Sequence, residues 1–156
     1  MLLWRLQNGE MPKTLQPKVW WLLIGTNDAH AGCTPDVVVA GNLRILQELR
    51  QHSPDTPIVI NSLLPRGPAP LLANQNVIMN TLRAANQQLA CYAAQTPGVY
   101  FANLTDMFTE VREKERLYIK KEFYNERDWV HPSPEGNIAW EDYMVERVQK
   151  MIEGGV

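Results

Sequence analysis

Apolar residues occur in three short continuous runs, separated by longer stretches in which apolar residues recur at helical spacing. The first run, Val19 to Ile24, contains no polar residue. Strands at the centre of a parallel sheet have this pattern because helices cover both of their faces. The run is short, stops at Gly25 and contains Val, Trp and Ile, which favours a strand at Lys18–Ile24 over a buried helix.

The rest of the chain alternates between predicted helices and strands. Thr34-Pro35-Asp36 has the features of a helix start: an N-cap residue, a proline at the first position and an acid in the first turn. The predicted elements are a helix from there to about His52, a strand at Ile58–Leu63, a helix from about Leu72 or Asn74 to Ala94, a strand at Val99–Asn103, and a helix from Ser133-Pro134-Glu135 to Gly154-Gly155. This order predicts an α/β fold with a parallel sheet and right-handed crossovers, in which residues 1–156 form a single domain.

Three further segments are predicted from charge and spacing. Thr109–Arg127 is charged and lacks clear periodicity, so we expect a solvated loop with a short helix. Residues 2–6 resemble the last turns of an amphipathic helix that ends at Asn8-Gly9. The last helix is expected to turn four apolar residues inward, namely Ile138, Val145, Val148 and Ile152.

The composition excludes several classes of function. The net charge is −2, from 17 acidic and 15 basic residues, so neither nucleic acid nor an acidic membrane is an expected partner. No apolar run approaches the length of a membrane span, and the sequence shows no signal peptide. No predicted strand is followed by Gly-x-Gly-x-x-Gly, so dinucleotide binding is not expected. Cys33 and Cys91 lie far apart without metal-ligand spacing, which favours reduced thiols, a cytoplasmic location and the absence of a metal or cofactor.

A polar segment directly follows the first predicted strand. Its residues are Gly25, Thr26, Asn27 and Asp28. In an open α/β sheet, ligands bind beyond the carboxyl ends of the strands, where the Asn27 amide could donate hydrogen bonds to a substrate. Asn and Asp also form turns and cap helices, and for this stretch by itself that use is the commoner one.

A second candidate for chemistry precedes the last predicted helix. Asp128 and His131 are three residues apart on a tight loop, so the carboxylate can accept a hydrogen bond from one imidazole nitrogen. That bond would fix the tautomer, leave the other nitrogen free as a general base, and stabilise the imidazolium that forms. A lone His would instead be explained as a residue that positions the start of the helix.

The two segments together resemble blocks III and V of the SGNH (GDSL-type) hydrolases. Residues 25–28 match block III, and Asp128-x-x-His131-Pro132 matches block V. Within that superfamily the chain is most similar to the intracellular platelet-activating-factor acetylhydrolase catalytic subunits, through Lys18–Asp28 and Leu63–Gly67. The resemblance implies a three-layer, flavodoxin-like parallel sheet with helices on both faces.

The resemblance also implies a role for each matched residue. Asn27 would donate to an oxyanion hole, and Asp128 and His131 would be the acid and the base of a Ser-His-Asp triad. The supporting loop of Asn27 would consist of Gly25, Thr26 and Asp28. The substrate would be a small ester, possessing a short acyl group such as acetyl.

The nucleophilic serine of these hydrolases has no match in the sequence. In the family it lies in a Gly-Asp-Ser motif upstream of the position that Leu2 matches, and this sequence contains no Gly-Asp-Ser. We therefore expect a fold truncated at the N-terminus, without its first strands, and an inactive chain. The Lys18–Ile24 strand would then be a sheet edge, which favours pairing with other chains and aggregation.

Other residues are weaker candidates for the nucleophile. Cys33 follows block III and has intrinsic nucleophilicity, but no neighbour in the sequence would activate its thiol. Ser62 lies inside a predicted strand, and Ser133 is expected to cap a helix. The alternative to an ester hydrolase is a non-catalytic flavodoxin-like domain, which acts as a pseudoenzyme subunit in a homodimer or pairs with an intact subunit in a heterodimer.

Overall fold

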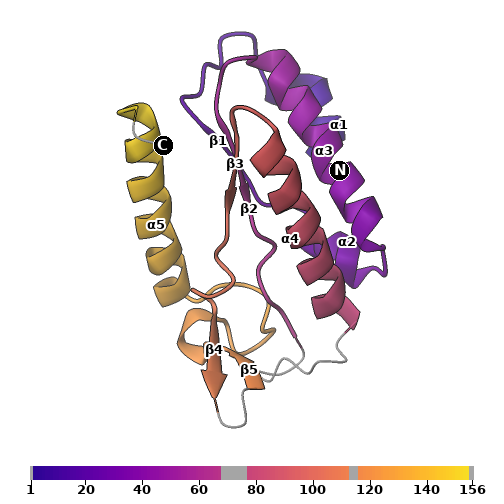
Figure 1. Cartoon of the computed structure of the whole chain (residues 1–156), viewed down its shortest axis with the longest axis vertical. Coiled ribbons are helices and arrows are strands. Elements are labelled where there is room, and N and C mark those ends of the chain that lie inside the picture. Colours follow the sequence, from indigo (N-terminus) through magenta and orange to yellow (C-terminus); the bar gives the residue numbers. More distant parts are fainter. Residues whose placement is uncertain (1, 68–76, 113–115, 155–156) are drawn as a thin grey trace. The chain divides into compact units, whose positions relative to one another are not determined.

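The computed structural model describes residues 2–67, 77–112 and 116–154 (Figure 1). The described residues form two compact units. One, which we call the sheet unit, comes from Met1–Leu63 and Thr81–Asn103, and the other, the histidine unit, comes from Leu64–Asn80 and Leu104–Val156. The elements in chain order are α1 (Leu2–Arg5), η1 (Leu6–Glu10), β1 (Trp20–Leu22), α2 (Thr26–His30), α3 (Pro35–His52), β2 (Ile58–Asn61), α4 (Val77–Gln95), β3 (Val99–Ala102), β4 (Thr109–Arg112), β5 (Arg116–Ile119), η3 (Lys121–Phe123) and α5 (Pro134–Ile152). The single domain expected for residues 1–156 stays a prediction.

The sheet unit contains a three-stranded parallel sheet in the order β1-β2-β3. Trp21 pairs with Val59, and Val59 pairs on its other side with Tyr100. All four residues of β2 are buried, because this strand has a neighbour on each side and a helical layer over it. The three predicted strands are confirmed as parallel neighbours, although each is shorter than predicted. Within the described residues, β1 lies at an edge of the sheet, as expected.

Helix α3 begins at Pro35 and ends at His52, as its sequence pattern predicts. Figure 1 shows α3 and α4 on the same side of the sheet, and Gln88 of α4 donates a hydrogen bond to Asp36 of α3 at 3.0 Å. The buried residues of α3 recur at helical spacing and are Val38, Val39, Asn42, Ile45, Leu46 and Leu49. The start predicted for the following helix, at Leu72 or Asn74, lies outside the described residues.

The prediction of a solvated loop over Thr109–Arg127 is wrong. Strands β4 and β5 form an antiparallel hairpin, and the short helix expected here is η3. Phe108 and Ile119 are fully buried, and the ring of Phe108 makes edge contacts with the rings of Phe123 and Tyr124. Most of the charged residues described in this segment are exposed, and they obscure the few large apolar residues that form the core of the hairpin.

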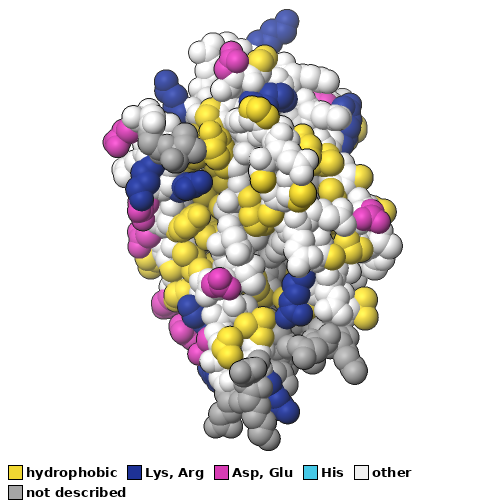
Figure 2. Space-filling view, viewed as in Figure 1, with side chains coloured by type: hydrophobic (Ala, Val, Ile, Leu, Met, Phe, Trp, Pro, Cys, Tyr) yellow, Lys and Arg dark blue, Asp and Glu magenta, His cyan; other side chains and the backbone are white. Residues whose placement is uncertain are grey.

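Helix α5 begins after the Ser133 cap, as predicted, but most of its expected inward face is exposed. Ile138, Val145 and Ile152 are 59%, 48% and 56% exposed, so the prediction is wrong for these three residues. The half-buried residues lie on the opposite side of the helix and are Ala139, Trp140, Tyr143, Met144, Arg147, Val148 and Met151. The helix carries two apolar stripes, and periodicity alone does not decide which one packs. Figure 2 shows acidic side chains along the outer surface of α5, at the left of the view.

The chain start is helical, as predicted. Helix α1 continues into η1, whose regular dihedral angles break at Asn8 and at Gly9, where φ is +104°. Gly9 therefore ends the helix by adopting a conformation that costs little only for glycine. No helix in the described part of the chain has the length and apolar character needed to cross a membrane.

Candidate active site

The first candidate segment begins at Gly25, three residues after the end of β1. Gly25 precedes the short helix α2, whose first three residues are Thr26, Asn27 and Asp28. The Ala29 N–H donates to the Gly25 carbonyl at 3.0 Å and closes the first helical turn. The expected supporting loop is thus a helical turn, because the polar residues complete backbone hydrogen bonds immediately after the strand. That correction changes the form of the segment and leaves its position after the strand unchanged.

The segment just after β1 is held tightly against α3. Gly25 has φ of +120°, and a Cβ atom there would lie 2.7 Å from Val38 Cγ1, so only glycine fits. The buried Asn42 of α3 donates from Nδ2 to the carbonyls of Ile24, at 3.1 Å, and Val38, at 2.9 Å. Sequence reasoning missed Asn42, although an Asn inside the apolar stripe of α3 is a readable signal. These contacts fix the backbone two residues before Asn27.

The side chain of Asn27 is available for a ligand. Asn27 is exposed, and among the described residues its side-chain amide makes no hydrogen bond. Its backbone carbonyl accepts the N–H of Ala31 at 2.9 Å, so the helical turn uses the backbone of Asn27 and not its amide. The N-cap position belongs to Gly25. The geometry therefore gives Asn27 no capping function, and leaves two N–H donors directed by a fixed backbone.

The second candidate segment is the loop that carries Asp128 and His131. Nδ1 of His131 lies 2.8 Å from Oδ2 of Asp128, so the predicted hydrogen bond between these two side chains is confirmed. Oδ1 of Asp128 accepts the N–H groups of Val130, at 2.9 Å, and His131, at 3.0 Å. One carboxylate thus holds both the imidazole ring and the backbone of the loop.

The charge of Asp128 decides which nitrogen of His131 carries the proton. The hydrogen bonds from the His131 side chain and from the His131 and Val130 backbone lower the pKa of the Asp128 carboxyl to about 2. At neutral pH the carboxylate can only accept, so Nδ1 of a neutral His131 must be the donor and Nε2 carries the lone pair that can accept. The imidazole side chain is 76% exposed, so Nε2 can be reached by another group.

Backbone hydrogen bonds close this loop into a compact ring. The Asn125 N–H donates to the His131 carbonyl at 2.8 Å, and the Trp129 N–H donates to the Asn125 carbonyl at 2.9 Å. Trp129 has φ of +51°, and it is the one non-glycine residue of the described chain with a positive φ. A left-handed conformation costs a bulky residue about 1–2 kcal/mol. The surrounding bonds must therefore hold the strained residue in place, next to the candidate site.

Two further bonds tie this loop to Pro65–Gly67, within the histidine unit. The phenol O–H of Tyr124 donates to the Pro65 carbonyl at 2.5 Å, and the Gly67 N–H donates to the Trp129 carbonyl at 3.3 Å. Burial raises the pKa of the Tyr124 phenol well above its ordinary value, so it remains a donor at any pH near neutral. Sequence reasoning missed Tyr124 because it lies in the segment interpreted as a solvated loop.

The residue after this loop is the N-cap of α5. Ser133 Oγ accepts the N–H of Gly136 at 3.1 Å and donates to the Glu122 carbonyl at 2.5 Å, which confirms the predicted cap. A Cβ atom on Gly136 would lie 2.3 Å from the Phe123 carbonyl oxygen, so this helix start packs closely on η3. The helix start and η3 together fix the end of the loop that carries His131.

The other candidate nucleophiles remain weaker. Ser62 is completely buried in the sheet unit, and the hydroxyl of Ser133 is occupied by its two hydrogen bonds. Cys33 is a half-buried free thiol, and its use as a nucleophile stays a prediction. Among residues 2–67, 77–112 and 116–154, no three His, Cys, Asp or Glu side chains gather as they would around a metal ion.

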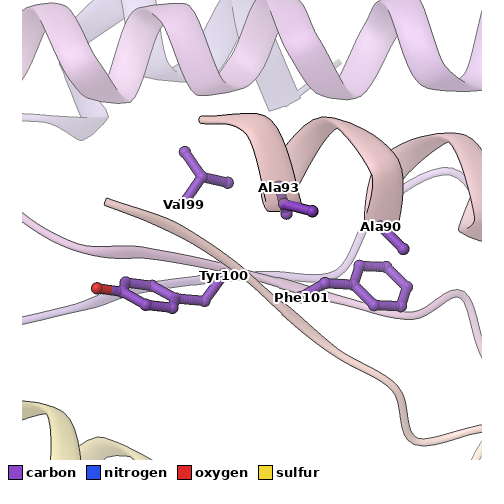
Figure 3. A pocket seen from close by; sticks show the side chains of 6 residues that line it. Ala90, Ala93, Val99, Tyr100 and Phe101 are labelled. Carbon is purple, nitrogen blue, oxygen red and sulfur yellow. The ribbon is translucent and has the colours of Figure 1, made fainter. Parts of the chain in front are cut away.

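A separate pocket lies in the sheet unit between α4 and β3, with a volume of about 340 Å³ (Figure 3). Its lining residues are Ala90, Ala93, Ala94, Val99, Tyr100 and Phe101. This lining is apolar except for one phenol, and it contains neither a carboxylate nor an imidazole. The pocket therefore lacks the groups for acid–base chemistry. Asn27 belongs to the sheet unit and His131 to the histidine unit. The expectation that both lie at one edge of the sheet therefore stays a prediction.

Curated proteins similar to this chain are acetylhydrolase subunits. The chain is 36% identical over 86 residues to platelet-activating factor acetylhydrolase IB subunit alpha1 of Homo sapiens, a match that covers 54% of this chain and 36% of that protein. It is 33% identical over 90 residues to the alpha2 subunit of Gallus gallus, covering 56% of this chain and 38% of that protein. The match thus spans little more than a third of the length of these relatives.

Solved structures share the fold at low sequence identity. A carbohydrate esterase family 3 protein from Talaromyces cellulolyticus superposes with a TM-score of 0.70 and 14% identity, over 97% of this chain and 68% of that one. An acetyl esterase mutant solved with an acetate ion also gives 0.70 and 14%, over 99% of this chain and 69% of that one. The family match covers residues 2–139, which include both candidate segments. The chain therefore belongs to the GDSL-like lipase/acylhydrolase family.

Proposed function

We propose that this chain supplies the acid, the base and one oxyanion donor of an SGNH-type carboxylic ester hydrolase. The observation that carries the proposal is the hydrogen bond of 2.8 Å between His131 Nδ1 and the ionised Asp128, which leaves Nε2 as a free acceptor. Family membership supports hydrolysis of an ester by acyl transfer. The relatives named for acetyl hydrolysis support a short acyl group such as acetyl.

In this mechanism His131 Nε2 takes the proton of a serine hydroxyl as the serine oxygen attacks the ester carbonyl. Asp128 keeps the ring in the required tautomer and stabilises the imidazolium. The Asn27 amide donates a hydrogen bond to the oxyanion of the tetrahedral intermediate. The imidazolium then protonates the departing alcohol. A water molecule, activated by the same nitrogen, releases the acid from the acyl-serine.

The 156 residues contain no Gly-Asp-Ser, the motif in which the resembled hydrolases carry their nucleophilic serine. We therefore propose that this chain alone does not turn over esters. An oxyanion donor and a base without their nucleophile leave only a small residual rate. The two free thiols, Cys33 and Cys91, support a reducing compartment such as the cytoplasm.

The second candidate function is a non-catalytic subunit that pairs with a copy of itself or with an intact subunit. The edge position of β1 favours it, since an unpaired strand edge can accept a strand from another chain. In that case the Asp128–His131 pair would be retained without use. Activity of the chain together with its serine-bearing segment separates the two functions.

The test begins with the transcript or genomic sequence upstream of Met1, because a reading frame there with Gly-Asp-Ser would define a longer protein. The longer protein, the 156-residue chain and the His131→Ala variant of each are then assayed with a short-acyl nitrophenyl ester. We expect turnover in the longer protein that His131→Ala abolishes, and none in the shorter chain. A soluble short chain with His131-dependent turnover would show that another residue, with Cys33 the first to test, is the nucleophile.

A further inference from the structure

We propose that Tyr124 is a positioning residue for His131, acting through a hydrogen-bonded connection that keeps Trp129 in its left-handed conformation. This inference rests on the proposed function, because it concerns the residue that would serve as the general base. The Tyr124 phenol bonds to Pro65 and the imidazole bonds to Asp128, so the two rings are not joined by a hydrogen bond. Tyr124 acts on the backbone that presents the imidazole.

The first step is the position of Tyr124 beside both ends of the histidine loop. Tyr124 forms an isolated antiparallel bridge with Pro132, the residue after His131. Its neighbour Asn125 donates its N–H to the His131 carbonyl and accepts the N–H of Trp129. The backbone at Tyr124 is thus the platform on which the loop closes.

The second step is the phenol, which connects this platform to a distant part of the chain. Tyr124 is 2% exposed, and its O–H donates to the Pro65 carbonyl, 59 residues earlier, at 2.5 Å. Two residues later the Gly67 N–H donates to the Trp129 carbonyl at 3.3 Å. The phenol therefore fixes the segment that in turn holds the Trp129 peptide.

The third step is strain. A residue as large as Trp129 keeps a φ of +51° only while its surroundings determine its conformation. The Trp129 N–H donates to the Asn125 carbonyl, and the Trp129 carbonyl accepts the Gly67 N–H. Among the backbone bonds described, the bond to Gly67 is the only one that this carbonyl makes. Asp128 precedes Trp129 and Val130 follows it, so rotation of this peptide would displace both. The Asp128 carboxylate would then lose its bonds to the N–H groups of Val130 and His131, which orient His131.

A buried phenol could instead be purely structural, so the test measures the imidazole itself. Tyr124→Phe keeps the packed ring and removes only the donor. The tautomer of His131 is read from its ring ¹⁵N chemical shifts in the 156-residue chain, at a pH where the imidazole is neutral. We expect the Nδ1–H form to dominate in the natural chain and to fall in Tyr124→Phe toward its share in a free histidine. The Gly67 amide should exchange with solvent at least tenfold faster.

Tyr118→Phe is the matched control, because Tyr118 is a half-buried tyrosine of β5, in the same unit but outside this hydrogen-bonded connection. It should change neither the tautomer nor the exchange of Gly67. Trp129→Gly removes the strain, so in that background Tyr124→Phe should change the tautomer much less. An unchanged tautomer in a folded Tyr124→Phe chain overturns the proposal, and so does an equal effect in both backgrounds.

A second background and a readout that does not depend on turnover keep the test decisive. If Tyr124→Phe fails to fold in the natural chain, the comparison is made in the Trp129→Gly background. There the left-handed conformation needs no support, so Tyr124→Phe should leave the tautomer as it is in Trp129→Gly alone, and a fall toward the share in free histidine overturns the proposal. None of these readouts requires ester turnover. Absence of turnover in the longer protein would reject the proposed function, whereas an unaffected tautomer would reject only the role of Tyr124.

Discussion

The two candidate segments present their functional side chains by different physical means. Asn27 follows a parallel strand and is held through its backbone by packing, with Gly25 pressed on Val38 and Asn42 bonded to Ile24. The Asn27 side chain itself makes no hydrogen bond among the described residues. The sheet unit thus fixes the backbone position of Asn27, and its side-chain amide can donate hydrogen bonds to a ligand.

The loop with Asp128 and His131 shows the opposite arrangement. His131 is exposed and its neighbours are half-buried, and hydrogen bonds determine the shape of the loop, beginning with those to the Asp128 carboxylate. One of its buried supports is Tyr124, which bonds to Pro65. A general base gains and loses a proton during the reaction, so its ring must keep one orientation in both protonation states. A charged carboxylate partner holds the ring in both. An oxyanion donor needs only a fixed direction.

The largest effect expected from this contrast is the loss of the base. In the longer protein, His131→Ala should lower kcat at least about a thousandfold, because no other group takes the proton of the nucleophile. Circular dichroism should show an unchanged fold, since the imidazole is 76% exposed. A variant with near-natural kcat would remove His131 from the mechanism.

Loss of the oxyanion donor should cost less. Asn27→Ala in the longer protein should lower kcat about 10²–10³-fold with a smaller change in KM, because the bond forms chiefly in the transition state. Gln51→Ala, an exposed amide on α3 remote from this segment in sequence, is the control and should leave kcat unchanged. Equal kcat in the two variants would contradict the role of Asn27.

The difference between the segments also explains what could be predicted from sequence. The strand before Gly25 and the helix start at Thr34-Pro35 follow from local rules, namely a continuous apolar run and a proline at the first helical position, and both were predicted. The pair Asp128 and His131 was found because its hydrogen bond spans three residues. A hydrogen bond between two side chains can be predicted from the sequence when both residues lie within one turn of the chain.

Nonlocal contacts were not readable in the same way. Tyr124 bonds to a residue 59 positions away, and the burial of Phe108 depends on a hairpin that the surrounding charges conceal. In α5, Ile138 and Val145 have helical spacing but lie on the exposed stripe. Which stripe packs is decided by the rest of the fold and not by the period.

A third prediction concerns stability at the end of the histidine loop. Gly136→Ala places a Cβ atom 2.3 Å from the Phe123 carbonyl oxygen, which is backbone and cannot move away cheaply. The free energy of unfolding should fall by about 1–3 kcal/mol or more, as for other overpacked sites.

The matched control for Gly136 is another helical glycine with open space around it. Gly41 of α3 has nothing within 4 Å of a Cβ atom, so Gly41→Ala should stabilise the chain by about 0.5–1 kcal/mol. Urea unfolding followed by circular dichroism measures both. The same sign for the two substitutions would show that the contact with Phe123 is not made.

The smallest effect expected is the pH dependence that Asp128 contributes to stability. Its pKa is lowered from 3.8 to about 2 in the folded chain, so the unfolded chain binds more protons as the pH falls. The stabilisation is therefore complete above about pH 4–5 and is lost as the pH decreases toward 2.

In Asp128→Asn the amide oxygen can still accept the Val130 and His131 N–H groups, but the side chain no longer titrates. The difference in unfolding free energy between natural chain and variant should accordingly be constant near neutral pH and shrink in acid. Because the carboxylate is 38% exposed, salt should weaken this difference. Unfolding of both chains at a series of pH values measures it, and a difference that grows as the pH falls would mean that Asp128 is not held ionised by its contacts.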